Sequence, residues 1–89
     1  MTEIEKTVII KNKQGLHARP AALFVQLANK FDSDINVKKE RDTVNGKSIM
    51  GIMMLAAEKG SKVTLIAKGH DAQRAVSELE KFLTDSTEL

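Results

Sequence analysis

The sequence of 89 residues predicts one α+β domain, in which helices lie on one face of a four-stranded antiparallel sheet. Apolar residues alternate with polar residues in some segments, as in strands, and recur every three to four positions in others, as in helices. The segments follow the order strand, helix, strand, strand, helix, strand, helix. Because 42% of the residues are apolar, only one face of the sheet can be covered. We expect mixed residues such as Thr7, Ile9, Lys38 and Lys68 on the solvent face.

The first half of the chain contains three of the strands and one helix. A strand is predicted over 6–11, where β-branched residues are flanked by lysines and a turn follows. A hairpin of two strands is predicted around 35–37 and 43–44, on either side of a charged corner. Between them, a helix is predicted over 18–31, because five apolar residues share one helical face. These residues are Ala21, Phe24, Val25, Ala28 and Phe31.

The second half of the chain predicts two helices and the remaining strand. Ser48 precedes a short apolar segment, 49–55, and is a residue type that caps helices. A strand is predicted over 62–68 from its alternating apolar residues. Asp71 is then expected to act as the N-cap of the last helix, whose apolar stripe is the clearest in the chain. The stripe consists of Ala72, Ala75, Val76, Leu79, Phe82 and Leu83.

Composition excludes several classes of function. The chain has no cysteine and only two histidines, which argues against disulfides and against most zinc sites. Its net charge of +2 is too small to indicate nucleic-acid binding. The three phenylalanines fall on predicted helices, so no aromatic sheet surface is available for stacking RNA bases. The segment Gly46-Lys47-Ser48 is not a P-loop, because Arg41 stands where that motif requires glycine.

The N-terminal residues are acidic, and no apolar run approaches the length of a membrane span. We therefore expect a cytoplasmic protein that does not insert into membranes. No metal or cofactor site is predicted. His70 stands between Gly69 and Asp71 without other supporting residues, and is interpreted as a surface side chain.

One segment has the features of a chemical site. His17, Arg19 and Pro20 lie within four residues, where a loop containing Gly15 leads into the first helix. The start of a helix has unpaired N–H groups and a partial positive charge, both of which attract phosphate. With His17 as the N-cap, the N–H groups of Ala18 and Arg19 and the Arg19 side chain are placed to stabilise a phosphate group. The pattern predicts a histidine that becomes phosphorylated.

Pro20 and the positive helix end constrain the backbone and the charge state of the ring at His17. Pro20 falls in the first helical turn, where its missing N–H costs least. A residue before proline avoids helical dihedral angles, so we expect either strain at Arg19 or a later helix start. The positive end of the helix disfavours a protonated ring, which leaves a neutral nucleophile. The alternative is that His17 only caps the helix; Gly15, Arg19 and Pro20 in register favour the chemical interpretation.

Two motifs, in the same order as in a known family, extend this interpretation. Residues 15–21 (Gly-Leu-His-Ala-Arg-Pro-Ala) and 47–51 (Lys-Ser-Ile-Met-Gly) resemble those of HPr, the histidine-containing phosphocarrier of the bacterial phosphoenolpyruvate-dependent phosphotransferase system (PTS). The resemblance spans residues 1–89 and implies one HPr domain. It implies an open-faced β-sandwich with strand order 1-4-2-3 and a βαββαβα element order.

The resemblance implies a relay function without independent turnover. His17 would accept a phosphoryl group from enzyme I on its δ nitrogen, forming pros-phosphohistidine, and pass it to EIIA domains of sugar permeases. Arg19 and the backbone of Ala18 and Arg19 would stabilise the charge. No cofactor is implied, and we expect a monomer. A regulatory paralogue, of the nitrogen-type PTS or acting as a corepressor, is the alternative.

Ser48 has two interpretations. It is a helix N-cap on local grounds. The resemblance implies more, because in many Gram-positive relatives the matching serine is phosphorylated by an ATP-dependent HPr kinase/phosphorylase. That modification impairs transfer at the histidine and makes the protein a corepressor for a catabolite-control transcription factor. The implied docking face for partners comprises Ala18, Arg19, Ala22, Leu23, Gln26, Ser48, Ile49, Met50 and Met53.

Overall fold

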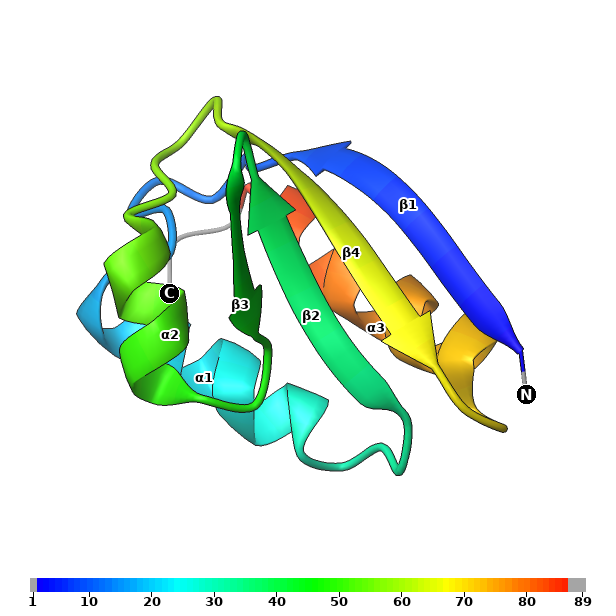
Figure 1. Cartoon of the computed structure of the whole chain (residues 1–89). Helices are drawn as coiled ribbons and strands as arrows, with labels where there is room; N and C mark the ends of the chain where they lie inside the picture. The colour runs from blue at the N-terminus through cyan, green and yellow to red at the C-terminus, as the bar shows by residue number, and fades with distance from the viewer. Residues whose placement is uncertain (1, 87–89) are drawn as a thin grey trace.

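The computed structural model describes residues 2–86, and its elements follow the predicted order (Figure 1). Each helix and strand begins and ends within a few residues of its expected position. Within the described residues, no helix has the length and apolar character needed to cross a membrane. The elements are β1 (Glu3–Ile9), α1 (Ala18–Ala28), β2 (Asp34–Lys39), β3 (Asp42–Asn45), α2 (Ile49–Leu55), β4 (Lys62–Lys68) and α3 (Ala72–Thr84).

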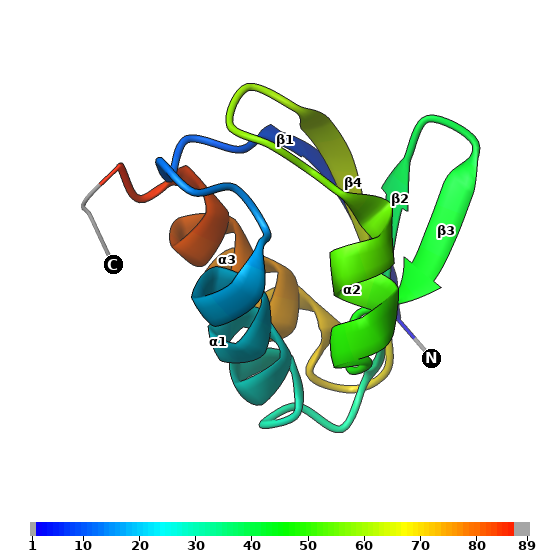
Figure 2. The same cartoon turned by 90° about the vertical axis from the view of Figure 1, so that its left-hand side faces the viewer.

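The four strands form one antiparallel sheet in the order β1-β4-β2-β3. This is the open-faced sandwich that was expected, and all three helices lie on the same side of the sheet (Figures 1 and 2). The opposite face is open to solvent, because the four mixed residues predicted there are exposed. They are Thr7, Ile9, Lys38 and Lys68.

The hydrophobic core lies between the sheet and the helices. Strand β4 contributes alternate buried residues, Val63, Leu65 and Ala67, as expected for a strand with one covered face. The predicted apolar stripe of α1 is buried except for Val25, which packs partly against the core. Rings from two helices meet in the core, with the centroids of Phe24 and Phe82 at 6.1 Å in an edge-to-face arrangement.

Strand β1 starts earlier and helix α1 ends earlier than predicted. The acidic residue Glu3 belongs to the sheet because the register places it opposite Lys68. Helix α1 ends at Ala28, after which the N–H groups of Lys30 and Phe31 bond carbonyl oxygens only three residues back. The chain tightens there into a 3₁₀-like turn, and Phe31 remains buried.

Asp71 stands at the N-cap position of α3, but its side chain does not cap the helix, contrary to the prediction. Its Oδ2 accepts a hydrogen bond from Asp32 N at 2.9 Å, and its Oδ1 accepts from Ser33 N at 3.0 Å and from the Ser33 hydroxyl group. These donors belong to the connection between α1 and β2. The carboxylate therefore joins two loops that are distant in sequence.

Candidate functional site

The loop between β1 and α1 carries His17 and is attached to the body of the protein on two sides. Lys11 N donates to Leu83 O at 2.9 Å, at the end of α3. Leu16 N donates to Ala57 O at 2.7 Å, directly after α2. Leu16 itself has no exposed surface. His17 consequently follows a residue whose backbone and side chain are both held in place.

The loop requires glycine at position 15, because it leaves no room for a side chain there. Its φ angle is +64°, in the left-handed region that strongly favours glycine. A Cβ atom on Gly15 would lie 2.6 Å from Ala57 O and 2.8 Å from the Cα of Glu58. The glycine of the sequence motif is thus explained by close approach to the connection between α2 and β4.

His17 is exposed and occupies the N-cap position of α1, as predicted. Its ring makes no capping hydrogen bond. The first bond of the helix runs from Ala21 N to His17 O at 3.4 Å, so the N–H groups of Ala18 and Arg19 precede the helical ladder. Pro20 is buried in the first turn, as expected.

The electrostatic environment of this helix start is positive. The first turn of α1 contains no acidic residue, and Arg19 is exposed beside His17. The partial charge of the helix end and the guanidinium group therefore act together on any anion that binds there.

Backbone strain occurs next to His17, but one residue away from the predicted place. Ala18 has a φ angle of +42°, whereas Arg19 is not among the residues with positive φ. A non-glycine residue in this region is uncommon and costs free energy, and such residues cluster at functional sites. The positive φ angle thus falls on Ala18, where the helix begins.

Ser48 caps α2 as predicted, since its Oγ accepts a hydrogen bond from Gly51 N at 3.0 Å. The neighbouring Lys47 donates from Nζ to Phe31 O at 2.6 Å, just beyond the end of α1. The start of α2 is therefore near the end of α1, whereas the end of α2 is near His17. The two helices run antiparallel (Figure 2). Ser48 and His17 lie at opposite ends of this pair, about 10 Å apart or more given the rise of seven helical residues.

The predicted docking residues are accessible on α1, on α2 and at the start of α2, and these two helices contact each other. Those on α1 are exposed or half-buried, and those on α2 are exposed. Met54 was not predicted there, although it is the most exposed large apolar residue of this helix at 77%. Its position four residues after Met50 was the signal available in the sequence. The exposed apolar residues of α2 are Ile49, Met50, Met53 and Met54.

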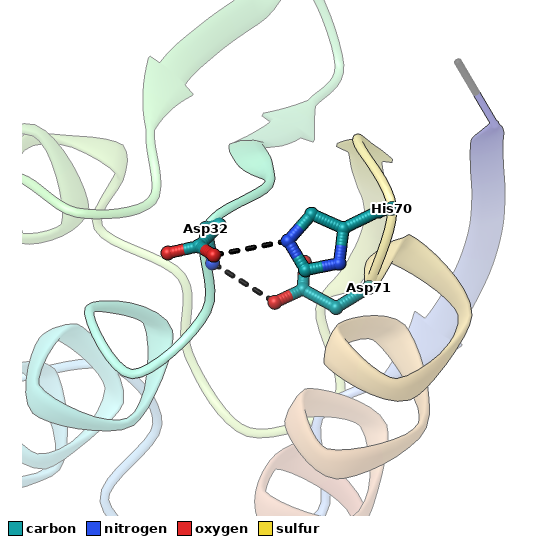
Figure 3. A group of neighbouring side chains, drawn as sticks. All are labelled: Asp32, His70 and Asp71. Atoms are coloured by element: carbon teal, nitrogen blue, oxygen red, sulfur yellow. Dashed lines mark hydrogen bonds and ion pairs between the residues drawn. The ribbon is translucent and has the colours of Figure 1, made fainter.

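A second cluster of titratable residues lies at the other end of α1 (Figure 3). His70 Nε2 is 2.9 Å from Asp32 Oδ2, and Asp71 accepts from the backbone N–H of Asp32. The hydrogen bond with Asp32, followed by the charge of Asp71, raises the pKa of His70. The Ser33 hydroxyl, assisted by the backbone N–H groups of Asp32 and Ser33, lowers the pKa of Asp71 from 3.8 to about 2.

His70 is exposed, as predicted, but its pairing with Asp32 in this cluster was not anticipated from the sequence. Asp32, His70 and Asp71 each offer a ligand atom within 4.8 Å of the others, which is the spacing of a metal site. The hydrogen bonds already account for their arrangement, however. The cluster joins the α1–β2 connection to the β4–α3 connection.

Comparison with known proteins matches this fold and site to one family. Residues 4–85 match the family described as "PTS HPr component phosphorylation site". The chain belongs to the HPr family. Two curated members of the family have different names. HPr-like protein Crh of Halalkalibacterium halodurans is 54% identical over 90% of this chain and 95% of its own length. Phosphocarrier protein HPr of Treponema pallidum is 45% identical over 96% of this chain and 97% of its own length.

Solved structures of HPr-family proteins have the same fold. A crystal structure of HPr from Bacillus anthracis has a TM-score of 0.91 and 48% identity, covering 93% of this chain and 99% of its own. A crystal structure of Crh from Bacillus subtilis has a TM-score of 0.76 and 46% identity, covering 97% and 99%. The Crh structure is described as an intertwined dimer with a swapped domain.

Proposed function

We propose that this HPr-family chain is a phosphocarrier, in which His17 accepts a phosphoryl group from enzyme I and passes it to EIIA domains of sugar permeases in the cytoplasm. The observation that carries the proposal is the exposed His17 ring at the start of α1, whose first turn contains no acidic residue. The loop that carries the ring is held on both sides. A nucleophile placed in this way needs little reorganisation to react.

The proposed step is an in-line exchange between two histidines. The lone pair on Nδ1 of His17 attacks the phosphorus of the phosphohistidine of enzyme I. One nitrogen–phosphorus bond forms as the other breaks, and each ring keeps the proton on its other nitrogen. The N–H groups of Ala18 and Arg19, together with the Arg19 guanidinium group, stabilise the charge on the phosphoryl oxygens. The reverse exchange transfers the group to an EIIA histidine.

The face formed by α1 and α2 is the proposed docking surface for both enzyme I and EIIA. Flexible methionines suit a surface that binds several partners in turn. Met50, Met53 and Met54 are exposed on α2, which contacts the helix that carries His17. We add Met54 to the docking residues expected from the sequence.

Ser48 is proposed as a regulatory phosphorylation site for an HPr kinase/phosphorylase. Two phosphates of about −2 each repel by about 1.7 kcal/mol at about 10 Å in water, and physiological salt, with a screening length of about 8 Å, reduces this to about 0.5 kcal/mol. Direct repulsion between a phosphate on Ser48 and one on His17 is therefore too weak to block transfer. The phosphate would act on docking, since Ser48 adjoins the exposed Ile49 and Met50. The same change could create a surface for a catabolite-control transcription factor.

A regulatory module is the second candidate function. It is suggested by the 54% identity to a protein named Crh, a value matched by the 55% identity to an HPr from Thermoanaerobacter tengcongensis. In that case Ser48 would be the site in use, and His17 would rarely be phosphorylated. A crystal structure of Crh from Bacillus subtilis and one of an HPr from Thermoanaerobacter tengcongensis are both described as dimers. The oligomeric state therefore does not separate the two candidates.

Labelling with purified enzyme I and radioactive phosphoenolpyruvate tests the carrier function. Wild type is expected to gain one acid-labile phosphate, His17→Ala to gain none, and His70→Ala to behave as wild type. His70 is a matched control because it is the only other histidine in the chain. Absence of label on wild type, or label that persists in His17→Ala, would exclude the proposal.

The regulatory site is tested separately with ATP and an HPr kinase. We expect acid-stable phosphate on wild type and none on Ser48→Ala. Ser48→Asp should fold normally and accept phosphate from enzyme I more slowly, mainly through a higher KM. Light scattering of the purified protein gives the oligomeric state. An unchanged KM for Ser48→Asp would contradict the docking mechanism.

A further inference from the structure

Asn12 is a buried polar residue in the loop that leads to His17, and one of its atoms has no partner. Its exposed fraction is 1%. The amide nitrogen Nδ2 donates to Gly15 O at 2.8 Å, but no donor among residues 2–86 reaches the amide oxygen Oδ1. Because Gly15 O can only accept, the amide nitrogen must face it. The unpaired oxygen is thus a consequence of the bond to Gly15.

Stability alone does not account for asparagine at this position. A buried acceptor without a donor lowers the stability of the folded state. An apolar side chain would remove the unpaired Oδ1 but leave Gly15 O without its donor, so stability does not favour asparagine over an apolar residue. The amide group must therefore contribute something that an apolar residue cannot, and its one hydrogen bond indicates what this is.

The bond from Asn12 to Gly15 closes the turn a second time. Gly15 N donates to Asn12 O at 3.2 Å, and Asn12 Nδ2 donates back to Gly15 O at 2.8 Å. The backbone bond is the longer of the two. The side chain consequently fixes the orientation of the peptide group that joins Gly15 to Leu16.

That peptide group leads directly to the candidate site. Leu16 bonds to Ala57 O and is fully buried, and His17 is the next residue. A rotation of the Gly15–Leu16 peptide would have to be absorbed at Leu16, which cannot move, or at His17, whose ring is exposed. The bond between Asn12 and Gly15 O therefore acts on the backbone that leads into His17.

We propose that Asn12 is a positioning residue for His17, which holds the turn over 12–15 in the conformation that presents the ring to the phosphoryl donor. The inference rests on the proposed phosphocarrier function. The unpaired Oδ1 is the energetic cost of this arrangement. Asn12 itself does not touch the reacting atoms and acts only through the backbone between Gly15 and His17.

The first test variant is Asn12→Ala, which removes the bond without changing the number of unpaired buried acceptors. Gly15 O loses its donor while Oδ1 disappears, so one unpaired buried acceptor replaces another. We expect the melting temperature to change little. Misplacement of a reacting group by about 1 Å can slow a reaction roughly a hundredfold, and we expect about a tenfold lower kcat for transfer from enzyme I. The KM for this protein should stay within about twofold, because the α1–α2 face is unchanged.

Asn12→Asp provides the conservative comparison. A carboxylate has the same shape but cannot donate to Gly15 O, whereas a protonated carboxyl group can. Burial raises the pKa of a carboxyl group, so protonation is accessible at mildly acidic pH. The kcat of Asn12→Asp relative to wild type should therefore recover as the pH falls, and that of Asn12→Ala should not.

Ser33→Ala is the matched control, because Ser33 is the other buried polar residue described and lies beyond the opposite end of α1. It should melt at a lower temperature yet transfer as wild type does. Hydrogen exchange at the Leu16 amide should be faster in Asn12→Ala and unchanged in Ser33→Ala. The proposal is overturned if Asn12→Ala transfers within about twofold of wild type, or if its loss of kcat follows stability as in Ser33→Ala. If wild type itself takes up no phosphate, the phosphocarrier function fails first, and the positioning role fails with it.

Discussion

Gly15→Ala should damage the loop that carries His17 by two effects that can be separated. The first is conformational, because a φ angle of +64° is unfavourable for alanine. The second is steric, because the new Cβ would lie 2.6 Å from Ala57 O and 2.8 Å from the Cα of Glu58. Both neighbours are backbone atoms, so the connection between α2 and β4 would have to move.

Gly60 isolates the first effect. Its φ angle is +91°, and a Cβ there would meet no atom within 4 Å. Left-handed alanine costs roughly 1–2 kcal/mol, and the stiffer unfolded chain offsets about 0.4–1 kcal/mol of this. Gly60→Ala should therefore lower the free energy of unfolding by about 1 kcal/mol.

Gly15→Ala adds the steric effect to the same penalty. Relief of the contact requires the Leu16 N–Ala57 O bond of 2.7 Å to lengthen or break. Its loss adds about 1–3 kcal/mol, because both groups are then left unpaired near the core. We expect the free energy of unfolding to fall by roughly 3 kcal/mol in total. A protein with the usual free energy of unfolding, about 5–15 kcal/mol, remains folded after such a loss.

Urea unfolding followed by circular dichroism gives the two free energies, and the enzyme I assay gives the transfer rates. Gly60→Ala should transfer phosphate as wild type does, whereas folded Gly15→Ala should be more than about tenfold slower, because His17 is displaced. Equal destabilisation by the two substitutions would refute the close-approach argument. Normal transfer by Gly15→Ala would refute the claim that this contact positions His17.

Three further predictions concern the loops and caps. The pKa of Asp71 is lowered to about 2 by its bonds with Ser33 and the adjacent backbone. Its contribution to stability is therefore complete above about pH 4 and lost as the pH falls toward 2. Acid titration of Asp71→Asn should lack this loss of stability. The pKa of His70 is raised by Asp32. The stabilisation that this pair gives the folded state is therefore fully present below pH 6.5 and disappears as the pH rises through the raised pKa. The melting temperatures of wild type and His70→Gln should differ at pH 5.5 and converge by pH 8.5. Ser48→Ala removes the cap of α2 and should lower the free energy of unfolding by about 1 kcal/mol in urea titrations, with the fold and the rate of phosphate uptake from enzyme I preserved.

Much of this structure was accessible from local patterns in the sequence. The motif around His17 indicated a helix start with an unpaired positive end, and the structure has such a helix start. Ser48 was expected to cap α2 and does so. These features depend on residues within about four positions of one another, where helix geometry and side-chain type decide the outcome.

Other features follow only from contacts between distant segments. Asp71 has the residue type and position of an N-cap, yet its carboxylate bonds to Ser33, 38 positions earlier in the chain. His70 finds its partner in Asp32 at the same separation. Residue types near Asp71 and His70 contain no information about which loop the topology brings beside them. The sequence therefore predicted a local cap for Asp71 and no partner for the exposed His70.

The sequence by itself determined which residue could carry a phosphoryl group, because chemistry and helix start are both local properties of the segment at His17. The tertiary structure decided how that residue is held and what surrounds it. Gly15 must be glycine because Ala57 and Glu58 approach it from the end of another helix. Ser48 lies at the far end of the docking face from His17 because α1 and α2 pack antiparallel. The distinction arises because short-range geometry is encoded in neighbouring residues, whereas packing joins segments whose proximity only the complete fold creates.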